Sequence, residues 1–255
     1  MKAAARMMTV HVGKAFEERS LAILQSRLSM SLRHVGGRGD GGVDLQGWWW
    51  VPRLPSASLQ DRRRIRILAQ CKAFRSKLGP VHIRELEGAA LFYQRPASAL
   101  DLAYTTEPTE PTEPEPEPEP EPELESDRNP SELVAMLISL SGFTSAAIRR
   151  AIASPVPFLL LHIPALKVDP NTKQPAYSQP LPKGRVSEPL GSIIWNSPLA
   201  GESGLLGGHM QVRWELGRGG RPVLYWGKHR LKHWTPEMDP DKGTSRYDRA
   251  RPTLS

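Results

Sequence analysis

Five side chains in the N-terminal part of this 255-residue chain have the types that metal-dependent phosphodiester hydrolysis requires. They are the carboxylates of Glu17, Asp40 and Asp44, the amide of Gln70 and the amine of Lys72. Magnesium prefers oxygen ligands and is often held by one or two carboxylates together with water and phosphate oxygens. A nearby lysine can orient or help to deprotonate an attacking water and can balance charge in the transition state. These residue types predict a hydrolytic site that uses Mg²⁺ or Mn²⁺.

The roles within this predicted site follow from residue chemistry. Asp44 and Glu17 would bind the metal through their carboxylates, and the backbone carbonyl of Cys71 would be a third oxygen ligand. Lys72 would act on the water and the phosphate. Two simpler interpretations stay open at this point: Gln70 and Lys72 could be the solvated face of a strand, and Glu17 could stabilise a helix dipole from the first turn.

Hydrophobic periodicity indicates the elements that position these residues. A helix is expected over residues 12–28, with Glu17 at the border of its buried face. A glycine-rich loop at 36–42 leads into a strand at 43–51, and a second strand covers 65–73. In that second strand the alternation places Ile65, Ile67, Ala69 and Cys71 on one face, and Gln70 and Lys72 on the other. If the two strands are neighbours, Asp44 meets Gln70 and Lys72.

The rest of the chain predicts an α/β core with a β-rich C-terminal extension. A helix is expected at 80–93, followed by apolar runs at 133–140 and 158–163 that flank a helix at 144–153. Two apolar strands joined by a helix indicate a parallel crossover. The predicted core domain is therefore 10–163, and the segment 164–255, rich in Pro, Gly and Trp, is predicted to pack on it with a hairpin at 209–216 and 222–231.

An acidic tract interrupts a basic body. Residues 105–127 hold ten of the 27 carboxylates and no Lys or Arg, so the remaining chain has 34 basic and 17 acidic residues. Repeated Glu-Pro units predict an extended, disordered insert, either a tolerated loop or a binding segment for a basic protein partner. The basic body makes DNA the first partner to consider. We expect nucleic-acid contacts at Arg38 and at Arg62, Arg63 and Arg64, with a solvated loop as the alternative for the triple arginine.

Composition also excludes several classes. One cysteine, Cys71, rules out a disulfide framework and a thiolate zinc cluster. The longest apolar runs are much shorter than the roughly 20 residues that span a bilayer, so no membrane span is expected. The N-terminus is mildly basic and has no acid before Glu17, which is compatible with a mitochondrial presequence. A homodimer is an open alternative to a monomer.

Two motifs resemble the signature of Mrr-like nucleases, the Gln-x-Lys branch of the PD-(D/E)xK restriction-endonuclease fold. They are the run Gly37-Arg38-Gly39-Asp40-Gly41-Gly42-Val43-Asp44 and the triplet Gln70-Cys71-Lys72. The resemblance implies a mixed central sheet flanked by helices. It also implies that Asp44 is the metal-binding aspartate, that Gln70 replaces the usual acid, and that Lys72 is the catalytic lysine. Glu17 would restore the charge that Gln70 lacks, and Asp40 would shape the loop and could bind a second ion.

Three further features are similar to the fungal mitochondrial "required for respiratory growth" protein 7 family. They are the tryptophans at 48–50, the run Arg84-Glu85-Leu86-Glu87-Gly88, and a tail with Trp195-Asn196 and Leu224-Tyr225-Trp226. This resemblance implies a mitochondrial location and a nuclease-fold protein that maintains or expresses the mitochondrial genome. A catalytically inactive protein that binds DNA or serves as a scaffold is the alternative.

Overall fold

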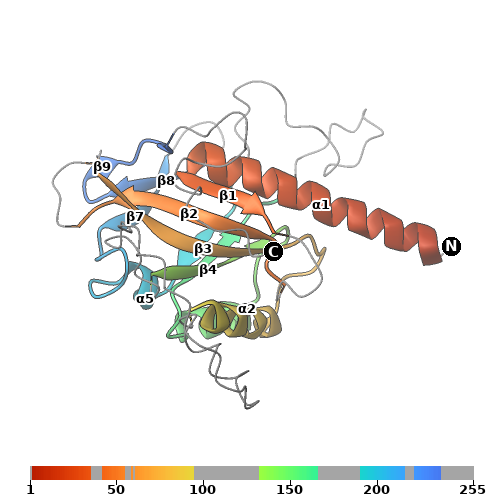
Figure 1. The fold of residues 1–255 in the computed structure, drawn as a ribbon. Helices are drawn as coiled ribbons and strands as arrows, with labels where there is room; N and C mark the ends of the chain where they lie inside the picture. The colour runs from red at the N-terminus through yellow and green to blue at the C-terminus, as the bar shows by residue number, and fades with distance from the viewer. Residues whose placement is uncertain are drawn as a thin grey trace, which may run out of the picture.

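The computed structural model of this protein describes residues 2–35, 42–54, 59, 61–94, 132–165, 190–215 and 221–236. These residues form a six-stranded sheet with the order β1-β2-β3-β4-β5-β6 and a separate three-stranded sheet with the order β7-β8-β9. Helix α1 runs along one side of the large sheet and α2 lies on the opposite side (Figure 1). The predicted α/β class is confirmed.

The elements follow one another along the chain as follows: α1 (Lys2–Arg27), β1 (Met30–His34), β2 (Leu45–Pro52), β3 (Arg62–Lys72), α2 (Pro80–Tyr93), β4 (Leu133–Ser139), α4 (Ser145–Ile152), β5 (Phe158–His162), β6 (Ile193–Trp195), α5 (Ser197–Ala200), β7 (Met210–Glu215), β8 (Arg221–Trp226) and β9 (His229–Arg230). Strand β3 is parallel to β4, and β4 is parallel to β5, whereas the pairings β1–β2, β2–β3 and β5–β6 are antiparallel. The large sheet is therefore mixed, and the predicted crossover through β4, α4 and β5 is confirmed.

The two faces of the large sheet hold two separate hydrophobic cores. Phe16, Ile23 and Leu24 of α1 pack on one face with the β3 residues at odd-numbered positions from 65 to 71. The other core joins Leu68 of β3 to α2 and α4. The predicted alternation along β3 is thus confirmed, and it places Gln70 on the face opposite α1.

Some element boundaries differ from those predicted. Helix α1 begins at Lys2, ten residues earlier than expected. Strand β1 was not predicted; it follows a turn in which Ser29 has a φ of 57°. The solvated-loop alternative for the triple arginine at 62–64 is wrong, because these arginines belong to β3 and pair with β2 residues 50–52. A strand accepts them because the aliphatic part of an arginine packs on the sheet while its charged end reaches outward.

The C-terminal segment contributes to both sheets. Residues 193–195, beyond the expected end of the core domain at 163, form β6 beside β5 in the large sheet. The predicted hairpin is present as β7 and β8, and β9 adds a short third strand. The acidic tract at 105–127, Arg38 and Asp40 lie outside the described residues. No helix in the described ranges is long and apolar enough to cross a membrane.

Candidate functional site

Asp44 is fixed at the end of β2 by hydrogen bonds to both neighbouring strands. Its amide donates to the Ala69 carbonyl at 2.9 Å, and its carbonyl accepts from the Val35 amide at 3.0 Å. Its carboxylate Oδ2 accepts from the Cys71 amide at 2.6 Å. The structure therefore brings Asp44 next to the Gln70–Lys72 segment, as the pairing of the two strands requires.

Glu17 brings a second carboxylate to the same place from α1. Its side chain is 28% exposed, and its Oε2 lies 3.9 Å from Nδ1 of His34. Burial raises the pKa of Glu17 above its usual 4.5, and the charge of Asp44 raises it further, while His34 and Lys14 oppose the shift. The Asp44 carboxylate therefore acts on Glu17 electrostatically, and both acids belong to one site.

The helix-dipole interpretation of Glu17 is wrong. Helix α1 begins at Lys2 and has no acid in its first turn, so Glu17 lies about four turns into the helix. The dipole acts only within the first and last turns. The position of Glu17 is instead set by the buried stripe around Phe16 and Ser20, which holds α1 against the sheet.

His34 is a site residue that the sequence did not reveal. It is the last residue of β1 and pairs with Leu45, the residue after Asp44. Strand β1 has only five residues, and their burial runs from three buried to two exposed without alternating. A period-two pattern therefore could not detect the strand, and the position of His34 just before the glycine-rich loop was the only available signal.

Gln70 presents a buried oxygen to the site. It is 4% exposed, and its Oε1 has no hydrogen-bond partner among the described residues. Its Nε2 lies against Gly42, where an added Cβ would be only 2.7 Å away. Gly42 also has a φ of 78°, so only glycine suits both its conformation and its space. A buried oxygen without a partner is one that a bound cation could satisfy.

Cys71 and Lys72 occupy opposite faces at the end of β3. The Cys71 thiol faces α1, where burial and then the charges of Asp44 and Glu17 raise its pKa well above 9.0, while Ser20 and Lys72 act in the opposite direction. A thiol in such an environment is not a nucleophile at neutral pH. Lys72 shares the face of Gln70, and its carbonyl accepts from the Leu140 amide at 3.1 Å. The neighbouring strand thus holds the end of β3 in place.

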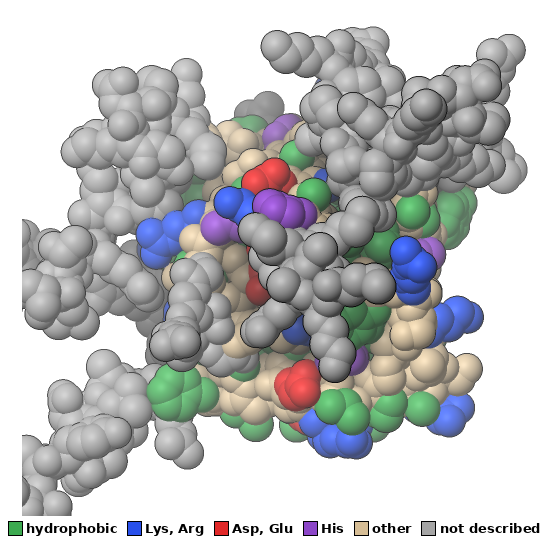
Figure 2. All heavy atoms as spheres, turned by 90° about the vertical axis from the view of Figure 1, so that its right-hand side faces the viewer, with side chains coloured by type: hydrophobic (Ala, Val, Ile, Leu, Met, Phe, Trp, Pro, Cys, Tyr) green, Lys and Arg blue, Asp and Glu red, His purple; other side chains and the backbone are tan. Residues whose placement is uncertain are grey.

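The donor set fits a magnesium ion of the kind that keeps several waters. Two carboxylates, from Asp44 and Glu17, and the amide oxygen of Gln70 are all oxygen donors. The Cys71 amide points at Asp44, and because the amide and carbonyl of one strand residue point to the same side, its carbonyl does too. Within the described ranges there is no group of three or more His, Cys, Asp or Glu residues that could hold a metal, so Asp44 and Glu17 would be the only acidic ligands there. The end of the molecule that lies on the right in Figure 1 faces the viewer in Figure 2, which shows acidic, basic and histidine side chains close together.

The three predicted nucleic-acid arginines do not form one patch. Strand β3 has 11 residues, so Arg62 is about 33 Å from Lys72 at 3.3 Å per residue. Alternation puts Arg62 and Arg64 on one face of the sheet and Arg63 on the other. Arg63 donates to Glu132 at 2.6 Å and also to the Leu205 carbonyl, and its side chain is only 14% exposed. Arg63 therefore connects β3 to Glu132 and Leu205 and has a structural role.

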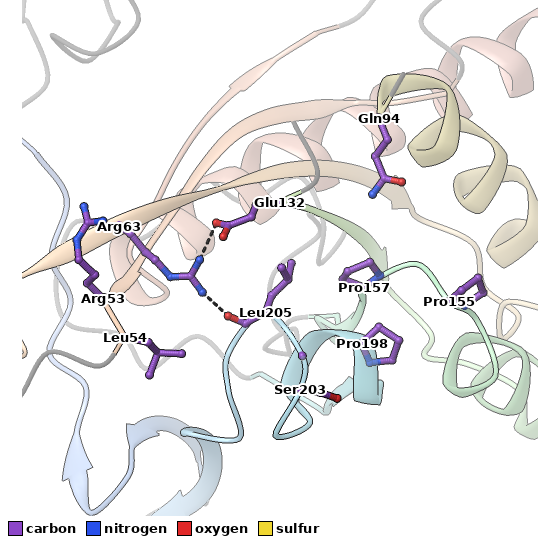
Figure 3. A pocket seen from close by; sticks show the side chains of 11 residues that line it. Arg53, Leu54, Arg63, Gln94, Glu132, Pro155, Pro157, Pro198, Ser203 and Leu205 are labelled. Carbon is purple, nitrogen blue, oxygen red and sulfur yellow. Dashed lines mark hydrogen bonds and ion pairs between the residues drawn. The ribbon is translucent and has the colours of Figure 1, made fainter. Parts of the chain in front are cut away.

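Arg63 lies in a groove of about 700 Å³ at this far end of β3. Three prolines line the groove together with Arg53 and the partners of Arg63 (Figure 3). Pro155 and Pro157 come from the loop between α4 and β5, and Pro198 comes from α5. The groove is remote from Asp44. It contains none of the residues that were predicted to take part in hydrolysis.

Comparison with known proteins supports a relationship over the N-terminal part of the chain. The family described as Required for respiratory growth protein 7 matches residues 8–63 and 55–112. Over these residues the chain is similar to this family. A Saccharomyces cerevisiae protein named "Required for respiratory growth protein 7, mitochondrial" is 33% identical over 120 residues, which cover 34% of this chain and 50% of the relative. A protein of the same name in Vanderwaltozyma polyspora is 31% identical over 115 residues, which cover 32% of this chain and 46% of the relative.

A mitochondrial protein of Schizosaccharomyces pombe is 33% identical over 85 residues, which cover 33% of this chain and 32% of the relative. This chain thus spans at most about half the length of these curated relatives. All three are named as mitochondrial, which confirms the predicted mitochondrial location. The region matched to the family contains Glu17, Asp44, Gln70 and Lys72. No solved structure matches the chain.

Proposed function

We propose that this protein is a nuclease-fold protein that acts on mitochondrial DNA and supports respiratory growth through Mg²⁺-dependent phosphodiester hydrolysis. The observation that supports the proposal is the position of Asp44 at the start of β2: it raises the pKa of Glu17 in α1, and its carboxylate accepts from the Cys71 amide in the Gln70–Lys72 segment. Two mutually repelling carboxylates, an unpaired amide oxygen and a lysine form a site that would bind a divalent cation and a phosphate together.

Each residue has a distinct task in this proposal. Asp44 and Glu17 would hold the metal, which when bound supplies positive charge for the reacting phosphate. Gln70 would add a neutral oxygen, and Lys72 would hold the attacking water and balance charge on the phosphate. His34, 3.9 Å from Glu17, would keep the Glu17 carboxylate in place.

The mixed sheet is compatible with a restriction-endonuclease-like fold. An antiparallel hairpin of β2 and β3 follows the first helix and carries Asp44 and the Gln70–Lys72 segment, and β3 then pairs in parallel with β4. The catalytic residues of the Mrr-like signature would thus lie on adjacent strands. We propose this fold assignment together with the function.

The test is cleavage of plasmid and linear DNA by the purified protein in the presence of Mg²⁺, Mn²⁺ or EDTA. We expect metal-dependent nicking that is lost in Asp44→Asn and Lys72→Ala variants with unchanged thermal unfolding. Asp61→Asn is the matched control, because Asp61 is an exposed acid that pairs with Arg53 at 3.3 Å, far from the site. If wild type and both site variants cleave equally, the activity comes from a contaminant and the proposal fails.

A second candidate is a binding protein that keeps the fold but has no catalysis. It is favoured by Gln70, which is neutral where a second acid is usual, and by the presence of only two carboxylates at the described site. In that case a Lys72→Ala variant would restore respiratory growth in cells that lack the protein, whereas a hydrolytic role predicts that this variant fails.

A further inference from the structure

Arginines and aromatic rings alternate on the face of the large sheet opposite α1. The register pairs Trp48 with Arg66 and Trp50 with Arg64. Paired residues of an antiparallel ladder point to the same face, which is also the face of Gln70 and Lys72. Trp50 is buried, with 4% of its surface exposed, and packs edge-on against Trp234. We call the accessible set Trp48, Arg62, Arg64, Arg66 and Tyr93 the arginine-aromatic strip.

The members of the strip are arranged with cations beside rings. The guanidinium carbon of Arg64 lies 4.5 Å from the ring centroid of Trp48, and that of Arg66 lies 5.3 Å from the ring of Tyr93, the last residue of α2. Arg62 donates to the Trp50 carbonyl at 3.3 Å. Trp48, Tyr93 and the three arginines are half-buried, so each is held by the fold and still has surface in contact with solvent.

The three strands around the strip have one sign of charge. Strands β1, β2 and β3 contain five arginines and Lys72 but no Asp or Glu. A long strip of positive charge favours a polyanion. Flat guanidinium groups and ring faces restrict the kind of polyanion further, because they stack on flat, unpaired bases and not on carboxylates.

We propose that the arginine-aromatic strip binds single-stranded nucleic acid. Unpaired bases would stack on Trp48, Tyr93 and the guanidinium planes, and the arginines would also neutralise phosphates. A duplex keeps its bases stacked inside, so it cannot use the ring faces. Residues on one face repeat about every 7 Å along a strand, so Arg62, Arg64 and Arg66 extend over about 13 Å of β3, up to the point where α2 covers the same face at Leu68. This binding does not rest on the proposed function.

The experiment measures binding by fluorescence anisotropy with the full chain and labelled 12-nucleotide oligo(dT) and oligo(U), and with a duplex of the same length. We expect single strands to bind about tenfold more tightly than the duplex, and Trp48→Leu or Arg64→Gln to weaken single-strand binding about five- to a hundred-fold. Arg64→Gln should also reduce the dependence of log K on log salt by about 0.7, the value for one lost single-strand phosphate contact.

Arg213 provides a matched control. Its guanidinium carbon lies 4.4 Å from the ring of Tyr225 in the small sheet, so Arg213→Gln removes the same charge and the same kind of contact outside the strip. This variant should bind like wild type. If Trp48→Leu lowers thermal stability, Trp48→Phe retains a ring and should retain most of the binding. Arg64→Lys retains the charge but lacks the flat guanidinium plane, so it should lose part of the single-strand binding.

Asp44→Asn separates this inference from the proposed function. It should abolish cleavage and leave single-strand binding unchanged, so a protein that binds but never cleaves would refute the hydrolytic function and not the strip. Equal affinity for duplex and single strand, or equal losses in the strip variants and in Arg213→Gln, would overturn the inference. Competition by poly-glutamate as strong as competition by unlabelled oligo(dT) would also overturn it, because the strip would then select acidic peptides.

Discussion

At the scale of single residues, the protonation of Glu17 should control stability. Its pKa in the folded protein is raised above 4.5, chiefly by burial and next by Asp44. Well below pH 4.5 the carboxyl is protonated in both the folded and the unfolded chain, and its full contribution to stability is present. The folded protein favours the neutral form of Glu17. As the pH rises through the raised pKa of the folded state, Glu17 ionises and its contribution to the free energy of unfolding is lost.

Glu17→Gln should therefore leave stability unchanged at pH 4 and increase it by about 0.5 kcal/mol at pH 8, a modest value because the group is partly solvated. Urea unfolding at both pH values measures the difference, with Glu202→Gln as a control for an exposed acid. Addition of 10 mM MgCl₂ should stabilise wild type more than Glu17→Gln, because the variant lacks one carboxylate ligand. If the free energy of unfolding has the same pH dependence in wild type and in Glu17→Gln, the electrostatic account of Glu17 is wrong.

Gly42 gives a second prediction at the residue scale. Gly42→Ala would place a Cβ 2.7 Å from Gln70 Nε2 and would force a side chain into a backbone with a φ of 78°. We expect a loss of about 1–2 kcal/mol in the free energy of unfolding, together with reduced DNA cleavage as Gln70 is displaced. The control is Gly88→Ala, in the interior of α2 with nothing near its Cβ position, which should stabilise the protein by about 0.5–1 kcal/mol. A neutral Gly42→Ala variant would show that the loop can rearrange.

The site could be predicted from sequence where its residues have distinctive chemistry. Asp44, Gln70 and Lys72 stand out because polar side chains follow a glycine-rich loop and interrupt an apolar strand. Their proximity follows from strand pairing, and no distances are needed to infer it. His34 and the unpaired oxygen of Gln70 could not be found in this way, because both depend on the position of β1 and of Gly42 in three dimensions.

At the scale of elements, Asn196 joins the end of the crossover unit to the last strand of the large sheet. It is 3% exposed, and its Oδ1 accepts from the amides of Phe158 and Leu199. Its Nδ2 donates to the carbonyls of Ala151, Ser154 and Val156. One side chain thus connects β5, α5 and the loop after α4.

Asn196→Ala should cost about 3 kcal/mol or more, because it leaves several buried backbone groups unsatisfied. Asn196→Asp keeps both acceptor contacts and loses the donors, so its cost should be as large or larger because a charge is buried. Gln211→Ala, an exposed amide in β7, is the control and should change stability by less than about 0.5 kcal/mol. Chemical denaturation compares the three variants, and a small effect in Asn196→Ala would mean that water replaces the amide.

The sequence predicts those elements whose burial produces a clear pattern of apolar residues. Strands β4 and β5 are buried on both faces and read as continuous apolar runs, and α2 has a proline at its start and an inward stripe. Strands β1 and β6 lie at the edges of the large sheet with five and three residues, too few for a pattern to emerge. Three consecutive charges at Arg62–Arg64 suggest a solvated loop, whereas pairing with β2 and, for Arg64, the ring of Trp48 stabilise these residues in a strand.

At the scale of the whole molecule, the net charge of +7 combines a strongly basic body with an acidic tract at 105–127 that carries ten carboxylates. Without the tract, the body has 34 basic and 17 acidic residues. The tract is tethered to the body at both ends, so its effective concentration near the basic surface is high. Its carboxylates should therefore compete with nucleic acid for the arginines of the sheet.

Deletion of 105–127 should leave thermal stability within a few degrees of wild type, because shortening the connection between α2 and β4 changes the entropy of chain closure little. Affinity for nucleic acid at 50 mM salt should rise about three- to tenfold, and the gain should disappear near 0.5 M salt, where charges more than a few ångströms apart are screened. A variant of unchanged length with the ten acids replaced by Gln and Asn should show the same gain, since the effect depends on charge. If affinity for nucleic acid rises only in the deletion variant, the effect depends on the length of the tract and not on its charge. If neither variant changes binding but both lose respiratory growth and a bound protein, the tract serves as a docking segment for a basic partner, and the competition mechanism is wrong.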